Sequence, residues 1–447
     1  MASYLLRNSP VPTSEKKFTF STWLKLSSVS TAADNGIAEW YKSTNERHQI
    51  LIDSATRQLR CYSVEGGVLK IHIYSNMVFR DCNSWYHIVI QSDNTLASSS
   101  DRFKLWVNGV AQTFASYSWT FAQNVNINVF DGSGTRLNLG VRNETFANFL
   151  NGYLADTYYI DGSIIAPTEF GEEDANGVWI PKIDPTIASF GNAGVHLKYE
   201  NSGTIGLDSS GNGNNFSTSG TITKSVDTPS NVYATGNPLI PNGDIYSNGN
   251  NTHTTSSNNY RSLYSTLGVS SGKWYAECKM TDISGGNGFG IANQESGVGL
   301  VKTSANKYLG QDTNDVALFQ GGNLTHNGST VATYGAISAN DIIQIALDVD
   351  NGYIYFGKNG TWQNSGDPTS GATGTGGYAI SNIGSNGTYF FGTSQAQPSV
   401  SQLNFGNGFF GTTAVSSAGS NGNNSIFEYD VPTGYYALNT KNLATYG

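Results

Sequence analysis

Apolar and polar residues alternate through most of the chain. This period of two is typical of half-buried β-strands, because successive strand side chains point to opposite faces. In residues 18–26 (FTFSTWLKL), Phe18, Phe20, Leu24 and Leu26 share one face. Comparable runs occupy residues 49–53, 58–64, 68–74, 85–90, 103–108, 137–141 and 153–160. Strands that recur about every ten residues, separated by polar or Gly-rich turns, predict a β-sandwich.

A second set of strands is predicted at residues 274–280, 288–292, 342–348 and 353–357. Asn108-Gly109 and Asn359-Gly360 each follow an apolar strand, and Asn-Gly in that position predicts a hairpin because both residues tolerate positive φ. No amphipathic helix is predicted, apart from one short helical turn that begins at Pro167. The fold class we expect is all-β, with two antiparallel, jelly-roll-like β-sandwiches joined by an irregular connector.

Composition sets the expected domain boundaries. We expect a first sandwich at residues 1–171, a Pro/Gly/Asn-rich connector at 172–242 and a second sandwich at 243–410. Residues 411–447 should form a Gly/Ser/Asn loop followed by an ordered C-terminal segment. The connector is much longer than the ~4–6 residues of an ordinary loop, so it should pack on a neighbour. Core packing is expected for four tryptophans in strands: Trp23, Trp85, Trp106 and Trp274.

Charge and hydropathy exclude several classes of protein. The 447 residues carry a net charge of −9 and only 13% are charged, so we expect no nucleic-acid partner. The sequence contains neither a signal-peptide pattern nor an apolar run of about eighteen residues, so we expect no membrane partner. Aromatic residues make up 12% of the chain, enough for large cores. Cys61, Cys82 and Cys278 are predicted to be buried free thiols, with a Cys61–Cys82 bridge as the alternative.

Several stretches resemble known families. Residues 18–165 resemble a concanavalin A-like, laminin-G-type domain through FTFSTWLKL, WYHIVI, KLWVNG and LNGYLADTYYIDG. Residues 263–406 resemble a SPRY domain through GVSSGKWYAECKM, GFGIA, DIIQIALDVDNGYIYFGKNG and LNFG. GVWIPK, LDSSGNGNNF, DTPSNVYATGNPL and VPTGYYALNTKNL are similar to phrases in structural proteins of marine tailed bacteriophages. The resemblance implies a virion protein, made in the host bacterial cytoplasm, with other capsid or tail proteins as partners and a homo-oligomeric state in the particle.

Catalysis is not predicted. Concanavalin A-like folds include glycan hydrolases, which need two carboxylates about 5–5.5 Å apart on one face, and a Glu-x-Asp-x-x-Glu run is absent. The candidate acids are better explained as turn or surface residues: Glu172, Glu173, Asp174, Asp156, Asp161, Asp348 and Asp350. The six histidines are scattered, no Gly-x-Ser-x-Gly elbow occurs, and His87 is expected to be structural. We therefore expect a non-enzymatic protein without cofactors.

Metal binding is not predicted either. Asp208, Ser210, Asn212 and Asn214 follow the spacing at the start of an EF-hand loop. Ser219 stands where that loop needs a bidentate Glu, so a Gly/Asn turn is the better interpretation. Laminin-G-type domains sometimes bind calcium on a rim, but no residue of this chain maps onto such ligands. Whether a rim calcium is bound stays open at this stage.

Ligand binding is the positive hypothesis. Tyr117, Trp119, Tyr308 and Trp362 lie in polar, turn-like contexts and are the candidate ligand-binding residues. Trp362 is the first choice, because it follows the Asn359-Gly360 turn and should project from a loop tip. The expected function is glycan adhesion by lectin-like domains of a tail fibre, spike or head appendage. The alternatives are a purely structural capsid decoration or cement protein and, less favoured, a polysaccharide depolymerase.

Overall fold

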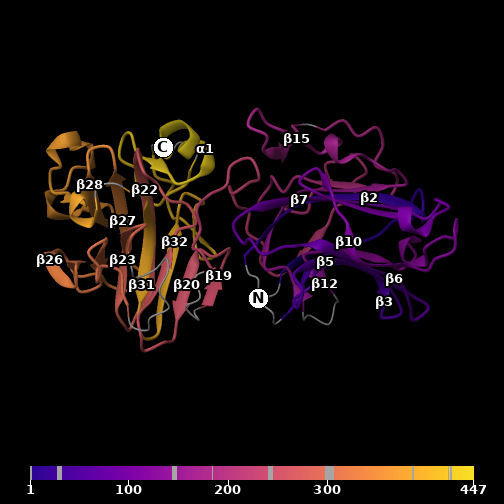
Figure 1. Cartoon of the computed structure of the whole chain (residues 1–447), viewed down its shortest axis with the longest axis horizontal. Coiled ribbons are helices and arrows are strands. Elements are labelled where there is room, and N and C mark those ends of the chain that lie inside the picture. Colours follow the sequence, from indigo (N-terminus) through magenta and orange to yellow (C-terminus); the bar gives the residue numbers. More distant parts are fainter. Residues whose placement is uncertain are drawn as a thin grey trace. The chain divides into compact units, whose positions relative to one another are not determined.

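The computed structural model describes residues 3–27, 33–142, 148–183, 185–239, 245–296, 307–384, 387–420, 422 and 425–447. The chain divides into two compact units, Met1–Lys224 (unit 1) and Ser225–Gly447 (unit 2). Each unit contains two antiparallel sheets packed face to face around its own core, as Figure 1 shows. The predicted all-β class with two β-sandwiches is confirmed.

Unit 1 consists of a larger and a smaller sheet. The larger sheet contains, in spatial order, β10 (Phe114–Trp119), β6 (Val68–Val78), β5 (Gln58–Glu65), β4 (Glu46–Ile52), β3 (Asn35–Ser43), β11 (Arg136–Leu139), β1 (Tyr4–Asn8) and β18 (Ser217–Ser219). The smaller sheet contains β17 (Val195–Leu197), β14 (Gly152–Asp161), β2 (Lys17–Leu26), β7 (Trp85–Asp93), β8 (Phe103–Val107) and β9 (Val110–Ala111). Short elements complete the unit: β12 (Val141–Arg142), β13 (Asn148–Phe149), β15 (Gly171–Glu173), β16 (Trp179–Pro181), and the 3-10 turns η1 (Ser99–Asp101), η2 (Asn128–Phe130) and η3 (Pro167–Glu169).

The core of unit 1 lies between the two sheets. Phe18, Phe20 and Leu24 of β2 meet Trp40 and Ile50 of the larger sheet there, as the alternation in β2 predicts. Because successive side chains of a strand point to opposite faces, the neighbours of these inner residues point outward. A second cluster therefore lies on the outer side of the smaller sheet, where Val89 and Tyr158 pack against Phe170.

The residues expected to form a separate connector are divided between the two units. Residues 172–224 belong to unit 1, and residues from 225 onward belong to unit 2. In this segment β17 joins the smaller sheet and β18 pairs with β1, while Ile187 and Phe190 cover the outer side of the smaller sheet. Residues 172–224 do not form a separate connector, because the apolar residues spaced through this Pro-rich stretch pack against unit 1.

Unit 2 repeats the two-sheet plan. Its larger sheet contains β19 (Ile245–Ser247), β20 (Thr252–Thr255), β32 (Ser399–Asn404), β22 (Lys273–Ile283), β27 (Ile342–Asp348), β28 (Tyr353–Lys358) and β29 (Thr361–Trp362), with β30 (Tyr378–Ala379) on β28 and β35 (Tyr436–Ala437) on β22. Its smaller sheet contains β21 (Arg261–Tyr264), β31 (Tyr389–Gln395), β23 (Asn287–Asn293), β24 (Asp315–Phe319), β25 (Asn323–His326) and β26 (Ser329–Thr333). The remaining elements are β33 (Phe409–Phe410), β34 (Thr413–Ala414), η4 (Gln363–Ser365), η5 (Pro368–Thr373), η6 (Ile380–Ile383) and α1 (Thr440–Tyr446).

The C-terminal segment packs on the outer side of the larger sheet of unit 2. Phe427, Val431 and Tyr435 bury Tyr275 and Tyr355 there. The segment is therefore ordered, as expected, and it also contains the helix α1, which the sequence did not predict. Residues 421, 423 and 424 of the expected Gly/Ser/Asn loop lie outside the described residues, and its earlier part contains the β33–β34 hairpin.

Several local predictions are confirmed. Asn108 and Gly109 turn the β8–β9 hairpin, and Asn359 and Gly360 turn the β28–β29 hairpin, all four with positive φ. The turn at Pro167 is η3. The three cysteines are buried and free. Among the described residues, none of the helices is long and apolar enough to cross a bilayer.

Candidate functional site

Two of the predicted ligand-binding aromatics, Tyr117 and Trp119, lie in strand β10 and not in a turn. Trp119 is buried, and its indole Nε1 donates a hydrogen bond to Oδ1 of Asn94 at 3.0 Å. The Tyr117 hydroxyl donates to the Ser99 carbonyl at 2.6 Å, while its ring packs against Phe114. The polar atoms of both side chains are therefore used within unit 1.

The other two candidates, Tyr308 and Trp362, lie in unit 2. The Tyr308 ring centroid is 4.9 Å from that of Tyr260 and 5.6 Å from that of Phe319. Trp362 is half-buried against the aromatic cluster of the C-terminal segment, with its ring 6.5 Å from Tyr275. The expected projection of Trp362 from a loop tip is wrong, because the outer side of this sheet offers it an aromatic surface to pack against.

Asp156, Asp348 and His87, which were considered for catalysis, have structural partners. Asp156 pairs with His196 at 2.7 Å, and Asp348 pairs with Lys273 at 2.8 Å. His87 is fully buried, with its ring nitrogens 2.8 Å from the Ser21 hydroxyl and 2.9 Å from Nε1 of Trp179. Burial lowers the pKa of His87 to about 3, so the imidazole is neutral at pH 7.

Asp208 organises the turn that resembles the start of an EF-hand loop. Its carboxylate accepts backbone hydrogen bonds from His196, Ser210 and Asn214 at 2.8–3.0 Å. The side-chain amides of Asn212 and Asn214 donate to backbone carbonyls, including that of Gly194. These side chains hold the backbone of the turn together. Within the described ranges, no group of three or more His, Cys, Asp or Glu is placed to hold a metal ion.

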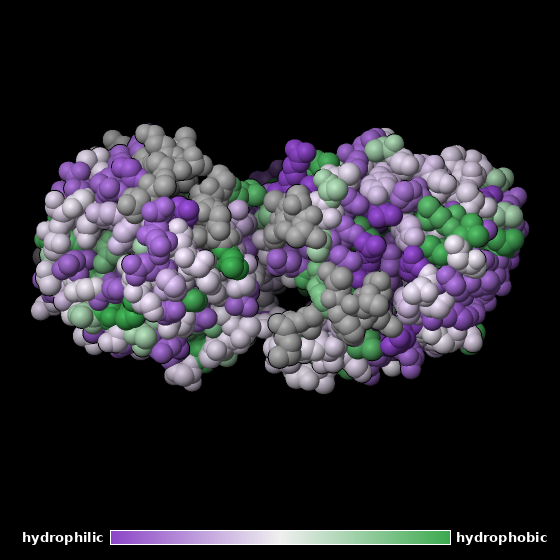
Figure 2. All heavy atoms as spheres, turned by 90° about the horizontal axis from the view of Figure 1, so that it is seen from below, coloured by the Kyte–Doolittle hydropathy of each residue, from purple (hydrophilic) through white to green (hydrophobic). Residues whose placement is uncertain are grey.

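A site that the sequence did not single out lies on the outer side of the larger sheet of unit 1. Neighbouring strands there place polar side chains in register, because paired residues of antiparallel strands point to the same face. One row runs through Glu39, Gln49, Tyr62 and His72, and the next contains Arg60 opposite Tyr74. We call the set Arg47, Gln49, Arg60, Tyr62, His72 and Tyr74 the polar face. Figure 2 views unit 1 from the side on which Figure 1 places β3, β5 and β6, and hydrophilic residues gather over its middle.

Two arginines and two tyrosines form the centre of the polar face. The Arg60 guanidinium carbon lies 4.8 Å from the Tyr62 ring centroid and 5.4 Å from the Tyr74 ring centroid. The Arg47 guanidinium lies 5.3 Å from the same Tyr62 ring, and its Nη2 donates to the Tyr62 hydroxyl at 3.0 Å. Cations over aromatic faces are attracted by the ring quadrupole, so each arginine helps to hold Tyr62 in place.

Charges on the polar face are only partly compensated. Asp53 Oδ2 is 3.8 Å from Nη1 of Arg60 and accepts a hydrogen bond from the Tyr74 hydroxyl at 3.4 Å. Burial and the nearby Arg60 lower the pKa of His72 below its usual 6.5. Nε2 of His72 and Nε of Arg60 are shielded from solvent and make no hydrogen bond within the described structure. Glu39 accepts hydrogen bonds from Gln49 at 2.5 Å and from Asn138 at 3.3 Å.

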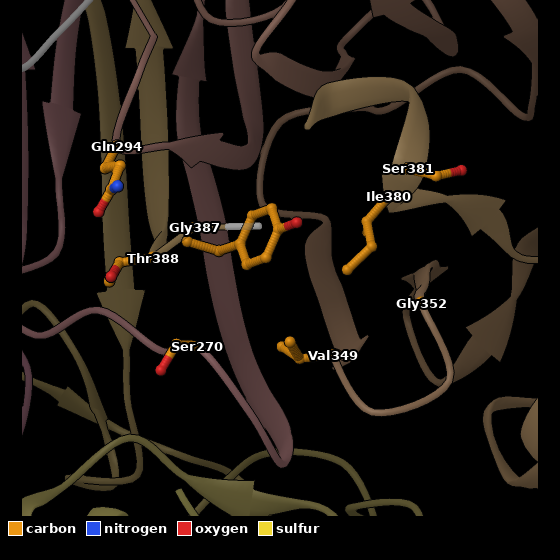
Figure 3. Close-up of a pocket in the computed structure, with 9 residues that line it drawn as sticks. Ser270, Gln294, Val349, Gly352, Ile380, Ser381, Gly387 and Thr388 are labelled. Atoms are coloured by element: carbon orange, nitrogen blue, oxygen red, sulfur yellow. The ribbon is translucent and has the colours of Figure 1, made fainter. Parts of the chain in front are cut away.

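A second candidate site is a cavity of about 430 Å³ at one end of unit 2. Its lining carries no charged side chain and consists of Ser270, Gln294, Val349, Gly352, Ile380, Ser381, Gly387, Thr388 and Tyr389. Figure 3 shows Gln294 and Thr388 on one side of it and Val349 and Ile380 on the other. Buried Ile380 and Tyr389 line the cavity together with the hydroxyl-bearing side chains of Ser270, Ser381 and Thr388.

Comparisons with known proteins assign part of the chain. Residues 2–163 match the model of a family described as the concanavalin A-like lectin/glucanases superfamily. The polar face lies within this match, and the laminin-G-type resemblance of the first domain is confirmed. No curated protein matches the chain.

The solved structures that are similar to this chain include SPRY domains. The SPRY domain of human HERC1 is 16% identical with a TM-score of 0.30, and the match covers 38% of this chain and 96% of that one. The TRIM65 PSpry domain is 11% identical with a TM-score of 0.29, covering 38% and 88%. Stonustoxin is 16% identical with a TM-score of 0.28, covering 38% and 27%. At these TM-scores the similarity carries no conclusion about what this chain does.

Proposed function

We propose that this chain is a non-enzymatic surface protein of a bacteriophage particle, a tail fibre, spike or head appendage, whose unit 1 binds host or environmental glycans through the polar face. The observation that supports glycan binding most strongly is the pair Tyr62 and Tyr74 on an outer sheet surface of a domain that matches a lectin and glucanase superfamily. Aromatic faces stack on sugar C–H groups, while the Arg47 and Arg60 side chains supply hydrogen-bond donors for hydroxyls.

The phage particle is proposed on the sequence phrases shared with marine tailed-phage structural proteins. Other capsid or tail proteins are the proposed partners, and the protein is proposed to be a homo-oligomer there. Labelling intact particles with an antibody against unit 2 tests this location. Label at defined positions on the tail or head supports it, and particles that lack the chain contradict it.

Glycan binding is tested by isothermal titration of the full chain against a panel of oligosaccharides, alongside binding to host cells. Tyr62→Ala should weaken binding by ~1–3 kcal/mol, if ring–sugar stacking is worth as much as base–aromatic stacking. Tyr62→Phe keeps the ring and removes only the hydroxyl that Arg47 contacts, so it should retain most of the affinity.

Tyr308→Ala in unit 2 is the matched control, because it removes a tyrosine that the sequence also nominated. It should leave binding unchanged. Loss of binding with Tyr308→Ala but not with Tyr62→Ala would show that the glycan site lies in unit 2. If the wild-type chain binds none of the glycans and does not bind cells, the chain is a structural decoration protein instead.

A further inference from the structure

We infer that the ligand of the polar face is a glycan built from carboxylate-bearing sugars; this rests on the proposed function and specifies its substrate class. The guanidinium groups of Arg47 and Arg60 are the main evidence for an anionic ligand. Arg47 and Arg60 converge on the single ring of Tyr62 from neighbouring strands, in a chain whose net charge is −9. Two adjacent arginines are unusual in a chain of negative net charge, so we expect this face to attract an anionic ligand.

Within the described residues the charges of these arginines are only partly neutralised. Arg47 makes no ion pair there, and its Nη2 donates a hydrogen bond to the uncharged phenol of Tyr62. The nearest carboxylate to Arg60 is Asp53, whose 3.8 Å separation from Nη1 is longer than a hydrogen bond. Nε of Arg60 has no acceptor but is shielded from solvent, so a ligand would be held by the Nη nitrogens. Fork-shaped donors of this kind match a carboxylate in a bidentate geometry.

The neighbouring rings define the rest of the ligand. Tyr62 and Tyr74 flank Arg60, so a bound carboxylate on Arg60 would lie beside aromatic faces that can stack on the pyranose ring that carries it. A neutral sugar on the same rings would leave the guanidinium donors without acceptors and lose the charge-assisted bonds. An isolated inorganic anion would bind the arginines but would make no stacking contact with the tyrosine rings. A uronic or sialic acid residue uses both.

The test titrates the full chain with oligogalacturonate, oligomannuronate and oligosialic acid, each beside the same oligomer with its carboxyls reduced to alcohols. At least one acidic oligomer should bind about 10-fold or more tightly than its reduced form, the factor that one charge-assisted hydrogen bond supplies. Arg60→Gln should abolish this preference, whereas Tyr62→Ala should weaken both forms. Arg261→Gln on β21 of unit 2 is the matched control and should change neither.

The outcomes separate this inference from the proposed function. If reduced and acidic oligomers bind equally and Arg60→Gln has no effect, carboxylate selection is wrong while glycan binding stands. If dextran sulfate binds as tightly as the best acidic oligomer, the face recognises negative charge in general and the carboxylate assignment is overturned. If no oligomer of either form binds, and neither does the neutral panel, both proposals fail.

Discussion

Tyr62 and Trp362 show how the surroundings of an outward-facing aromatic decide its role. Both lie on the outer side of the larger sheet of their unit. The outer side in unit 2 is covered by Phe427 and Tyr435 of the C-terminal segment, so Trp362 joins a hydrophobic cluster. Tyr62 instead has Arg47, Arg60 and His72 around it, which leaves a half-buried ring among polar groups.

Trp362→Ala should therefore change stability and not adhesion. Removing a half-buried indole from the Tyr275 cluster should lower the free energy of unfolding of unit 2 by about 2 kcal/mol, less than the ~3–5 kcal/mol of a fully buried aromatic. Urea denaturation beside a cell-binding assay measures both effects. Unchanged stability together with weakened adhesion would show that Trp362 contacts the ligand.

The sequence pattern predicted the strands well, but it did not show which aromatic side chains a ligand can reach. Strands β5 and β6 were predicted, and their alternation already placed Arg60, Tyr62, His72 and Tyr74 opposite the apolar face. Large aromatic and cationic residues at outward positions of adjacent strands were the signal that was missed. Their pairing depends on the register between β5 and β6, which a single sequence pattern does not provide.

At the scale of elements, a short hairpin made of β15 and β16 covers the outer side of the smaller sheet of unit 1. Nε1 of Trp179 in β16 donates to Nδ1 of the buried His87, and the two rings stack with centroids 6.0 Å apart. Gly171 lies against the Trp179 ring, where an added Cβ would be 2.6 Å from it. The hairpin thus depends on a glycine at that position.

Gly171→Ala should displace Trp179 and leave the His87 nitrogen without its donor. We expect a loss of about 1–3 kcal/mol in the free energy of unfolding of unit 1, as for other overpacking substitutions. Trp fluorescence together with urea denaturation measures the displacement and its cost. Gly203→Ala, where the nearest atom is a side-chain oxygen at 3.4 Å, is the control and should change little. Equal stability of the two variants would show that the hairpin is not held by this contact.

Elements with strong alternation were predicted nearly to the residue, and β27 (Ile342–Asp348) has the predicted bounds. Strand β3 was missed although it lies in the middle of the larger sheet, because NGIAEWYKS opens with Asn-Gly, which favours a turn locally. The hairpin with β4 and the long-range pairing with β11 override that preference. Packing of residues 172–242 on a neighbour was expected, but the strands β17 and β18 within this stretch were not located, because they are short.

At the scale of the whole molecule, the boundary between units predicts which fragments fold. Residues 1–224 retain Val195, Leu197, Ile205 and Phe216 of the unit 1 core, and residues 1–171 lack them. The longer fragment should give a dispersed amide NMR spectrum, and the shorter one should be collapsed or aggregated. A dispersed spectrum for residues 1–171 would show that β17 and β18 are dispensable.

Acid should affect the two units in opposite directions. Burial lowers the pKa of His48 and of His87 to about 3, so the unfolded chain binds more protons below pH 6.5 and unit 1 loses stability as the pH falls. Burial raises the pKa of Glu277 and of Asp315 to about 7, so folded unit 2 binds more protons and gains stability as the pH falls from 8 to 5. Each group contributes up to ~1.4 kcal/mol per pH unit within its window.

Thermal proteolysis of the full chain at pH 8, 6.5 and 5, with peptides assigned by mass spectrometry, measures the two melting temperatures separately. Peptides from residues 3–224 should become accessible at lower temperature as the pH falls, and those from 225–447 at higher temperature. Parallel shifts of both units would contradict this electrostatic account.

A crystal structure of the full chain soaked with the tightest-binding oligosaccharide would show whether unit 1 binds a glycan on its polar face. We expect a sugar ring stacked on Tyr62 or Tyr74 with an oxygen within hydrogen-bond distance of Arg60. A sugar bound only in the cavity lined by Ser270, Ile380 and Tyr389, or at another surface of either unit, would contradict it.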